Sequence, residues 1–232
     1  MSSELVTYTL EGTTAVLRMD DGKANALSDA MIEALTAALA KAEAEAGAIV
    51  LAGRPDKFCA GFDLRTMMSG PENAKALLQK GSQLLLALYG ASLPLVVACT
   101  GHALAGGALV VLTGDLRIAA AGAFRIGLNE VSIGLPVPVL AMELARDRLT
   151  AAALPSATLG ARIYSPDEAV IAGYVDEVAP PEAVLPRAVA EATRLGALPR
   201  SAYRATKVRL RGRTIDHIRA TMDDDLRTLL NG

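Results

Sequence analysis

The first fifth of the chain predicts a β-hairpin and then an amphipathic helix. Residues 5–10 and 14–19 are rich in apolar and β-branched side chains, and Glu11-Gly12 separates them, which favours a hairpin. Ser28 is the expected N-cap of the helix that follows, and Gly47 its expected end. Apolar residues recur at helical spacing between these two positions, at Met31, Leu35, Ala38, Leu39 and Ala42. One face of this helix is therefore expected to be buried.

Continuous apolar runs in the middle of the chain predict buried strands. These runs are "AIVLAG", "LVVACTG" and "LRIAA", followed by "AFRI" after Ala121-Gly122. Residues 93–114 contain no Asp, Glu, Lys or Arg over a length sufficient to cross a bilayer. However, Pro94, Gly101 and Gly106 interrupt this segment, which favours a buried strand, a tight loop and a buried helix. We therefore expect no membrane span.

The last third of the chain has a helical pattern. "SPDEAVIAG" begins with a Ser cap at Ser165, has Pro in the first turn and ends on Gly. Amphipathic segments follow at 181–195, 198–211 and 214–230. The apolar residues of the last segment have no partner sequence after them, which indicates an assembly surface formed by Ile215, Ile218, Met222, Leu226, Leu229 and Leu230. We divide the chain into a core of residues 1–178 and a helical C-terminal oligomerisation region of residues 179–232.

Composition and charge exclude several classes of protein. A net charge of −2 provides no basic surface for nucleic acid. Cys59 and Cys99 have no disulfide-framework spacing, and His102 and His217 do not complete a metal cluster with them. The cysteines are expected to be small buried side chains and His102 a hydrogen-bonded structural residue. "MSSELVTYTLEG" lacks the features of a signal or transit peptide, so we expect a cytoplasmic protein.

An ionisable residue interrupts the otherwise apolar segment "FRIGLNEVSIGLP" at 124–136. Glu130 lies at its centre, and burial of an unpaired carboxylate is costly and raises its pKa. Two alternatives follow. Glu130 either pairs with Arg117 or Arg125, or it has a catalytic role.

Two glycine-rich loops provide backbone amides that can approach a ligand closely. They are "FCAGFDL" at 58–64 and "GHALAGGALVVLTGD" at 101–115, and together they could form an oxyanion hole. The second loop lacks the Lys-Ser/Thr of a phosphate-binding P-loop and the third glycine of a dinucleotide fingerprint. Glu130 stands where a nucleophile elbow has its first glycine, so Ser132 is a poor nucleophile candidate.

The two loops and the Glu130 segment, in this order and at these separations, resemble the crotonase (enoyl-CoA hydratase/isomerase) superfamily. "KANALS" at 23–28, "SPDEAVIAGYVDEV" and the late "TK" pair extend the resemblance over most of the chain. The resemblance implies an α/β fold, a crotonase-type spiral of β-β-α units with a helical C-terminal trimerisation region. It also implies an acyl-CoA thioester as partner, no separate cofactor because coenzyme A is part of the substrate, and a homotrimer or dimer of trimers.

Residue by residue, the resemblance makes the N–H groups of Phe62 and Gly106 the two oxyanion donors. Hydratases of the family commonly hold one catalytic glutamate three residues beyond the second donor and another in the segment matching "NEVSIG". Here the first position is Leu109, and only the second, Glu130, is a carboxylate. The resemblance also implies substrate or CoA contacts at Lys23, Ala24, Ala60, Gly61, Asp63, Leu64, Leu109, Asn129 and Lys207. From the residues alone, Lys23 and Lys207 are solvated surface lysines, and Asp63 caps the next helix.

A single glutamate favours one reaction of the family. Hydration divides its acid and base work between two glutamates, whereas moving a double bond from the 3,4 to the 2,3 position needs one base. "AGGALVVLTGDLRI" and "IGLNE" resemble the Δ3,Δ2-enoyl-CoA isomerase branch, which acts in fatty acid β-oxidation. We therefore expect an isomerase in which Glu130 carries the proton. The alternatives are an enoyl-CoA hydratase of low or broad activity and a non-catalytic acyl-CoA binding protein.

Overall fold

The N-terminal hairpin forms one edge of a six-stranded sheet. A computed structural model describes the backbone of residues 4–231 and the side chains of residues 4–229. The strand order is β1-β2-β3-β5-β7-β9, with the hairpin antiparallel and the remaining pairs parallel. The strands are β1 (Val6–Glu11), β2 (Thr14–Met19), β3 (Ala48–Ala52), β5 (Leu95–Cys99), β7 (Leu116–Ala120) and β9 (Glu177–Ala179). The predicted hairpin is confirmed, as are the strands at "AIVLAG", "LVVACTG" and "LRIAA".

A second sheet of three parallel strands follows the order β4-β6-β8. Its strands are β4 (Asp56–Cys59), β6 (Gly101–Leu104) and β8 (Ile126–Gly127). β8 contains two residues, so the strand predicted at "AFRI" is largely wrong, because only Ile126 of that run is in it. Glycine allows the chain to pass closely from the first sheet to the second. A Cβ at Gly101 would lie 2.1 Å from the carbonyl carbon of Asp56.

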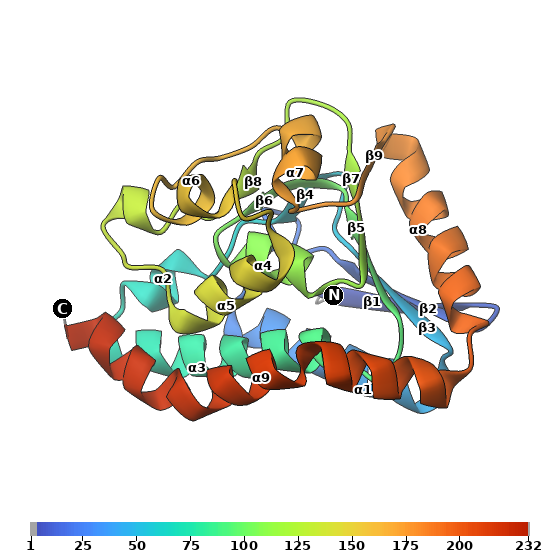
Figure 1. Cartoon of the computed structure of the whole chain (residues 1–232), viewed down its shortest axis with the longest axis horizontal. Coiled ribbons are helices and arrows are strands. Elements are labelled where there is room, and N and C mark those ends of the chain that lie inside the picture. Colours follow the sequence, from blue (N-terminus) through green and yellow to red (C-terminus); the bar gives the residue numbers. More distant parts are fainter. Residues whose placement is uncertain (1–3, 232) are drawn as a thin grey trace.

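The long helices cover both faces of the six-stranded sheet (Figure 1). Since the central strands are buried on both sides, they are apolar at almost every position. α8 (Pro181–Gly196) packs on one face through Val184, Ala188 and Ala192. The other face joins the main core, to which α1 (Asp29–Glu45), α3 (Pro71–Tyr89) and α4 (Gly106–Thr113) also contribute. Ser28 caps α1 as predicted, and the predicted apolar face of that helix is buried.

The other helices that precede α8 are short. They are α2 (Leu64–Met67), the 3₁₀ turn η1 (Val131–Ile133), α5 (Val139–Arg148), α6 (Leu154–Thr158) and α7 (Pro166–Ala172). α7 has the predicted Ser165 cap, the early proline and the terminal glycine in left-handed conformation, and Ser165 forms a capping box with Glu168. No helix within residues 4–231 is long and apolar enough to cross a membrane.

A single helix, α9 (Arg200–Asn231), replaces the two helices predicted at 198–211 and 214–230. It runs beside α3 along one side of the molecule (Figure 1). Ile218 is buried in the main core of the same chain, Ile215 and Met222 pack against that core, and Leu226 is buried in the wall of a cavity. These residues therefore have packing partners within their own chain, and assembly through this helix stays a prediction. Leu230 lies outside the described side chains.

Asp115 fixes the first half of α9 through buried charges. Its carboxylate contacts Lys207 Nζ at 2.6 Å and Arg211 Nη2 at 2.8 Å, and both cationic side chains are buried. Lys207 Nζ also donates to the carbonyls of Ala91 at 3.0 Å and Leu93 at 2.8 Å. The interpretation of Lys207 as a solvated surface lysine is therefore wrong. The sequence around Lys207 shows only the basic residues of a helix. Its acidic partner, Asp115, lies 92 positions earlier and gives no local signal.

Candidate functional site

Three loops meet at the carboxyl ends of the parallel strands of the second sheet. Phe62 follows the end of β4, Gly106 follows β6, and Glu130 follows β8. Because parallel strands end at the same edge of a sheet, residues that follow them converge there. Residues from three distant parts of the sequence are thereby collected at one edge.

Close backbone contacts hold the three loops together. A Cβ on Gly61 would lie 3.2 Å from the amide nitrogen of Gly106 and 3.0 Å from the carbonyl oxygen of Leu104. Ala105 N–H donates to the carbonyl of Gly127 at 3.0 Å, which ties the second loop to the segment that carries Glu130. Gly61 has a φ of 96°, a left-handed conformation that other residues rarely adopt. Any side chain at position 61 would separate the first two loops.

The two predicted oxyanion donors have no backbone acceptor. Within residues 4–231, neither Phe62 N–H nor Gly106 N–H donates to a carbonyl, although their neighbours Gly61 and Asp63 bond to Leu27. Gly106 is the first residue of α4, where helix geometry leaves amides free and the helix dipole favours negative charge. Ala105 before it has a φ of 49°, a strained conformation that costs about 1–3 kcal/mol. This arrangement suits stabilisation of an oxyanion.

Glu130 is buried without a cationic partner. Its side chain is 8% exposed, and Oε2 has no hydrogen-bond partner within the described residues. Arg117 binds Asp176 instead, with Nη2 at 2.6 Å from Oδ1, and Arg125 is exposed. The pairing alternative is therefore wrong. Burial raises the pKa of Glu130, and the backbone amides of Glu130 and Asn129 offset part of this rise. A raised pKa brings a carboxylate closer to the range useful to a general base near neutral pH.

Other buried polar groups without a partner lie around Glu130. They are Asn129 Oδ1 and the hydroxyl groups of Tyr164 and Tyr174. The two tyrosine rings lie 5.6 Å apart between centroids. Burial raises the pKa of Tyr174, the backbone amide of Leu128 offsets part of this rise, and the neighbouring Tyr164 and Glu130 raise the pKa further. Several unpaired polar atoms in one region indicate a place where a ligand or ordered water completes the hydrogen bonds.

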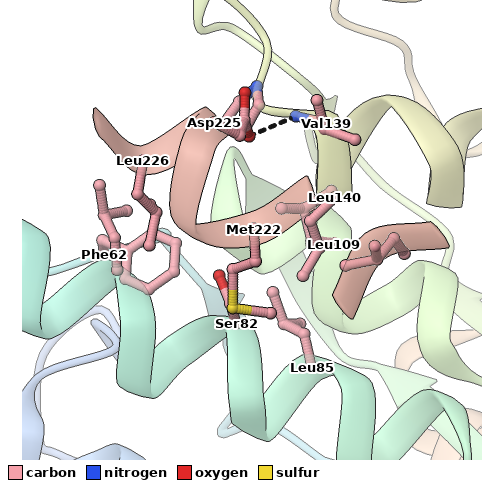
Figure 2. Close-up of a pocket in the computed structure, with 12 residues that line it drawn as sticks. Phe62, Ser82, Leu85, Leu109, Val139, Leu140, Met222, Asp225 and Leu226 are labelled. Carbon is pink, nitrogen blue, oxygen red and sulfur yellow. Dashed lines mark hydrogen bonds between the residues drawn. The ribbon is translucent and has the colours of Figure 1, made fainter. Parts of the chain in front are cut away.

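Leu109 and Phe62 face a small apolar cavity beside the oxyanion loops (Figure 2). Leu109 is 4% exposed and lies one helical turn beyond Gly106 on α4. The ring of Phe62 occupies the space that a side chain on Gly81 of α3 would need, since a Cβ there would lie 2.2 Å from Phe62 Cε1. The remaining walls are mainly apolar side chains of α3, α5 and α9, including Leu85, Leu140, Met222 and Leu226.

The other predicted binding residues fall into two groups. Lys23 and Ala24 lie in the loop beside Ala60, since Ala60 N–H donates to Ala24 O at 3.0 Å. Lys23 and Leu64 are exposed, so both are accessible to a ligand. Asp63 accepts from Thr66 N–H at 2.9 Å and caps α2, as the residues alone predicted. Lys207 instead uses its ammonium within the protein, through the contacts described above.

The structural expectations for Cys59, Cys99 and His102 are confirmed. Both cysteines are fully buried, and burial raises the pKa of each thiol to about 12. His102 Nδ1 accepts from Arg125 N–H at 3.2 Å. Among residues 4–231, no group of three or more His, Cys, Asp or Glu is placed to hold a metal ion.

No sequence pattern singles out Gly81, Tyr174 or Asp225, and the apolar spacing that includes Met222 predicted an assembly surface. Gly81 occupies an ordinary position in a helical pattern, and Tyr174 lies 44 residues after Glu130. Met222 and Asp225 are on α9, which we expected to face another subunit. The heptad-like spacing of the apolar residues on α9 could have indicated a buried face but not the surface it covers.

Comparison with known proteins identifies the family. Residues 9–229 match the family described as enoyl-CoA hydratase/isomerase. Human mitochondrial enoyl-CoA delta isomerase 1 is 31% identical over 222 residues, which span 94% of this chain and 74% of the human protein. A Mycobacterium tuberculosis structure described as an enoyl-CoA isomerase is 41% identical, with a TM-score of 0.91 over 95% of this chain and 97% of that one. A Mycobacterium ulcerans structure described as an enoyl-CoA hydratase is 40% identical, with a TM-score of 0.93 over 98% and 100%.

The chain therefore belongs to the enoyl-CoA hydratase/isomerase family and has the crotonase fold. It is a crotonase-family enzyme of the isomerase or hydratase kind. Because solved relatives at about the same identity are described as isomerases or as hydratases, the choice between the two reactions depends on the chemistry of the site.

Proposed function

We propose that this protein is a Δ3,Δ2-enoyl-CoA isomerase in which Glu130 is the only acid/base. The observation that carries the proposal concerns the two glutamate positions of the hydratases. Glu130 is buried at one of them without a cationic partner among the described residues, and the other holds an apolar residue, Leu109. A second carboxylate is what water activation would require. One carboxylate is sufficient for moving a proton between two carbons of the same substrate.

In the proposed reaction, Glu130 removes a proton from C2 of a 3-enoyl-CoA thioester. The electrons of the C2–H bond form a dienolate, and the negative charge moves to the thioester oxygen. The amides of Phe62 and Gly106 stabilise this oxygen because they are free and already oriented. As the carbonyl forms again, a C2–C3 double bond replaces the C3–C4 double bond, and Glu130 returns the proton to C4. The reaction needs no water and no redox partner.

The burial of Glu130 supports the same proposal. A carboxylate freed of hydration is a stronger base, and the apolar cavity of Leu109 and Phe62 beside the oxyanion loops disfavours water that would add to the product. Human enoyl-CoA delta isomerase 1, a relative over 94% of this chain, bears the name of this reaction. We also propose that the loop of Lys23 and Ala24, the segment Ala60–Leu64 and Asn129 contact the CoA thioester.

Enoyl-CoA hydratase is the second candidate, because a solved relative at 40% identity is described as one. The distinguishing experiment is to assay the purified protein on 3-hexenoyl-CoA and on 2-hexenoyl-CoA, following isomerisation and water addition separately. We expect isomerisation to exceed hydration. Leu109→Glu places a carboxylate at the missing position and is expected to gain hydration, with Leu109→Gln as a control of similar size without the charge. Hydration by the parent that equals or exceeds isomerisation would contradict the proposal.

A non-catalytic acyl-CoA binding protein is the third candidate. It predicts thermal stabilisation by hexanoyl-CoA without conversion of any enoyl isomer. A homotrimer or dimer of trimers and a cytoplasmic location stay predictions. Light scattering of the purified protein at micromolar concentration tests the first, and a monodisperse monomer would contradict it.

A further inference from the structure

The second half of α9 closes the apolar cavity beside Leu109. Ile218, Met222 and Leu226 recur every four residues, so they share one face of the helix, and all three line the cavity. Figure 2 shows Met222 directed from α9 toward Ser82 and Leu85 of α3, and Leu109 lines the same cavity. The cavity is small, with a volume of about 30 Å³. An acyl chain that extends past Leu109 would therefore meet Met222 and Leu226.

Asp225 fixes this part of α9 to α5. Its Oδ2 accepts from Val139 N–H at 2.7 Å, across 86 residues of sequence. Val139 is the first residue of α5, and Pro138 before it provides no side-chain cap. The carboxylate thus satisfies a free amide at the positive end of a helix dipole. Since Asp225 lies between Met222 and Leu226 on the helix, this hydrogen bond holds both side chains in the wall of the cavity.

We propose that Met222 and Leu226 set the upper limit of acyl-chain length and that Asp225 positions them. The inference rests on the proposed function, because it assumes that the substrate thioester lies against Phe62 and Gly106. The closed cavity favours short acyl-CoA thioesters. Met222 has a flexible, unbranched side chain, so the wall yields partly to a longer chain instead of excluding it completely.

Binding of saturated acyl-CoA thioesters tests the proposal without requiring turnover. Isothermal titration calorimetry would compare hexanoyl-CoA with dodecanoyl-CoA for the parent, Met222→Ala, Asp225→Asn and Asp223→Asn. Asp223 is exposed on the same turn, so its variant is a matched control for loss of charge. We expect the parent to bind the short thioester at least about tenfold more tightly, the scale on which an apolar pocket discriminates size. Met222→Ala should reduce this ratio about tenfold, Asp225→Asn should reduce it severalfold, and Asp223→Asn should leave it unchanged.

Two outcomes would overturn the inference. The first is equal affinity of the parent for both thioesters, or a ratio that neither Met222→Ala nor Asp225→Asn changes. The second is an Asp225→Asn variant that keeps the binding ratio but loses turnover of 3-hexenoyl-CoA, since Asp225 would then act in catalysis and not through α9. If the binding ratio changes as expected and no enoyl-CoA is isomerised, the proposed reaction fails while the role of α9 stands.

Discussion

Gly81→Ala separates the stability of the fold from the geometry of the oxyanion hole. Alanine is favoured over glycine in a helix interior by about 1 kcal/mol, so the substitution strengthens α3 itself. However, the new Cβ would lie 2.2 Å from Phe62 Cε1 and 2.6 Å from Cζ. Carbon atoms pack best at about 3.5–4.0 Å, so the ring must move by roughly 1 Å or more. A displaced ring in an unfavourable rotamer costs about 0.5–1.5 kcal/mol, which approximately cancels the helix gain.

The effect on catalysis should be much larger than the effect on stability. Phe62 provides a proposed oxyanion donor through its own amide, and its ring lines the cavity next to Leu109. A misplacement of about 1 Å in a catalytic site can cost a rate factor of about 10². We expect Gly81→Ala to reduce kcat/KM for 3-hexenoyl-CoA by about tenfold to a hundredfold. The melting temperature should change by no more than about 4 °C.

Gly212→Ala is the matched control. Gly212 lies within α9, and a Cβ there would have no neighbour within 4 Å. This variant should gain about 1 kcal/mol, raise the melting temperature by about 2–4 °C, and keep parental turnover. A Gly81→Ala protein with parental kcat/KM would show that the position of the Phe62 ring does not matter for catalysis. A Gly81→Ala protein that loses activity only because it unfolds would also refute the reasoning.

Three further predictions test other parts of the structure. Gly106→Pro removes a donor and should lower kcat about 10²- to 10³-fold relative to Gly106→Ala. The alanine variant is the control, because it adds the same first carbon but keeps the amide. Equal rates for the two variants would exclude this amide from the oxyanion hole. Asp115→Asn leaves Lys207 and Arg211 buried without their anionic partner, so chemical denaturation should show that the free energy of unfolding falls by about 3–5 kcal/mol. A decrease below about 1 kcal/mol would contradict the stabilising role of these buried ion pairs. Burial raises the pKa of Glu130, so ionisation of this residue costs stability as the pH rises above about 4.3, the pKa of a glutamate in the unfolded chain. Glu130→Gln should therefore be more stable than the parent near pH 8 but not below about pH 4. A stability difference that does not change with pH would contradict the raised pKa.

Local patterns were sufficient to predict most of the elements. The hairpin, the Ser28 cap, the buried strands and the capped helix at Ser165 depend on neighbouring residues, so their signals are present in short windows of sequence. The two-residue strand β8 and the three-residue strand β9 are too short to produce a periodic pattern. The continuity of α9 was missed because its polar middle weakens the apolar periodicity, whereas Asp115 stabilises that region from outside the helix.

The candidate site was predictable in part for the same reason. Glu130, Gly61 and Gly106 are unusual for their immediate surroundings, and the family resemblance related them to one another. The packing of Phe62 against Gly81 and the hydrogen bond from Val139 N–H to Asp225 join residues far apart in sequence without any local signal. Such contacts are determined by the tertiary fold, so only the structure reveals them.

Glu130→Gln tests the central claim most directly. The amide keeps the shape of the side chain but cannot accept the proton from C2. Isomerisation of 3-hexenoyl-CoA and affinity for hexanoyl-CoA would be measured on the same preparations of parent and variant. We predict a loss of kcat of about 10²- to 10⁴-fold, the usual contribution of a general base, with hexanoyl-CoA affinity within about threefold of the parent. Isomerisation by the variant at a rate near that of the parent would contradict the account.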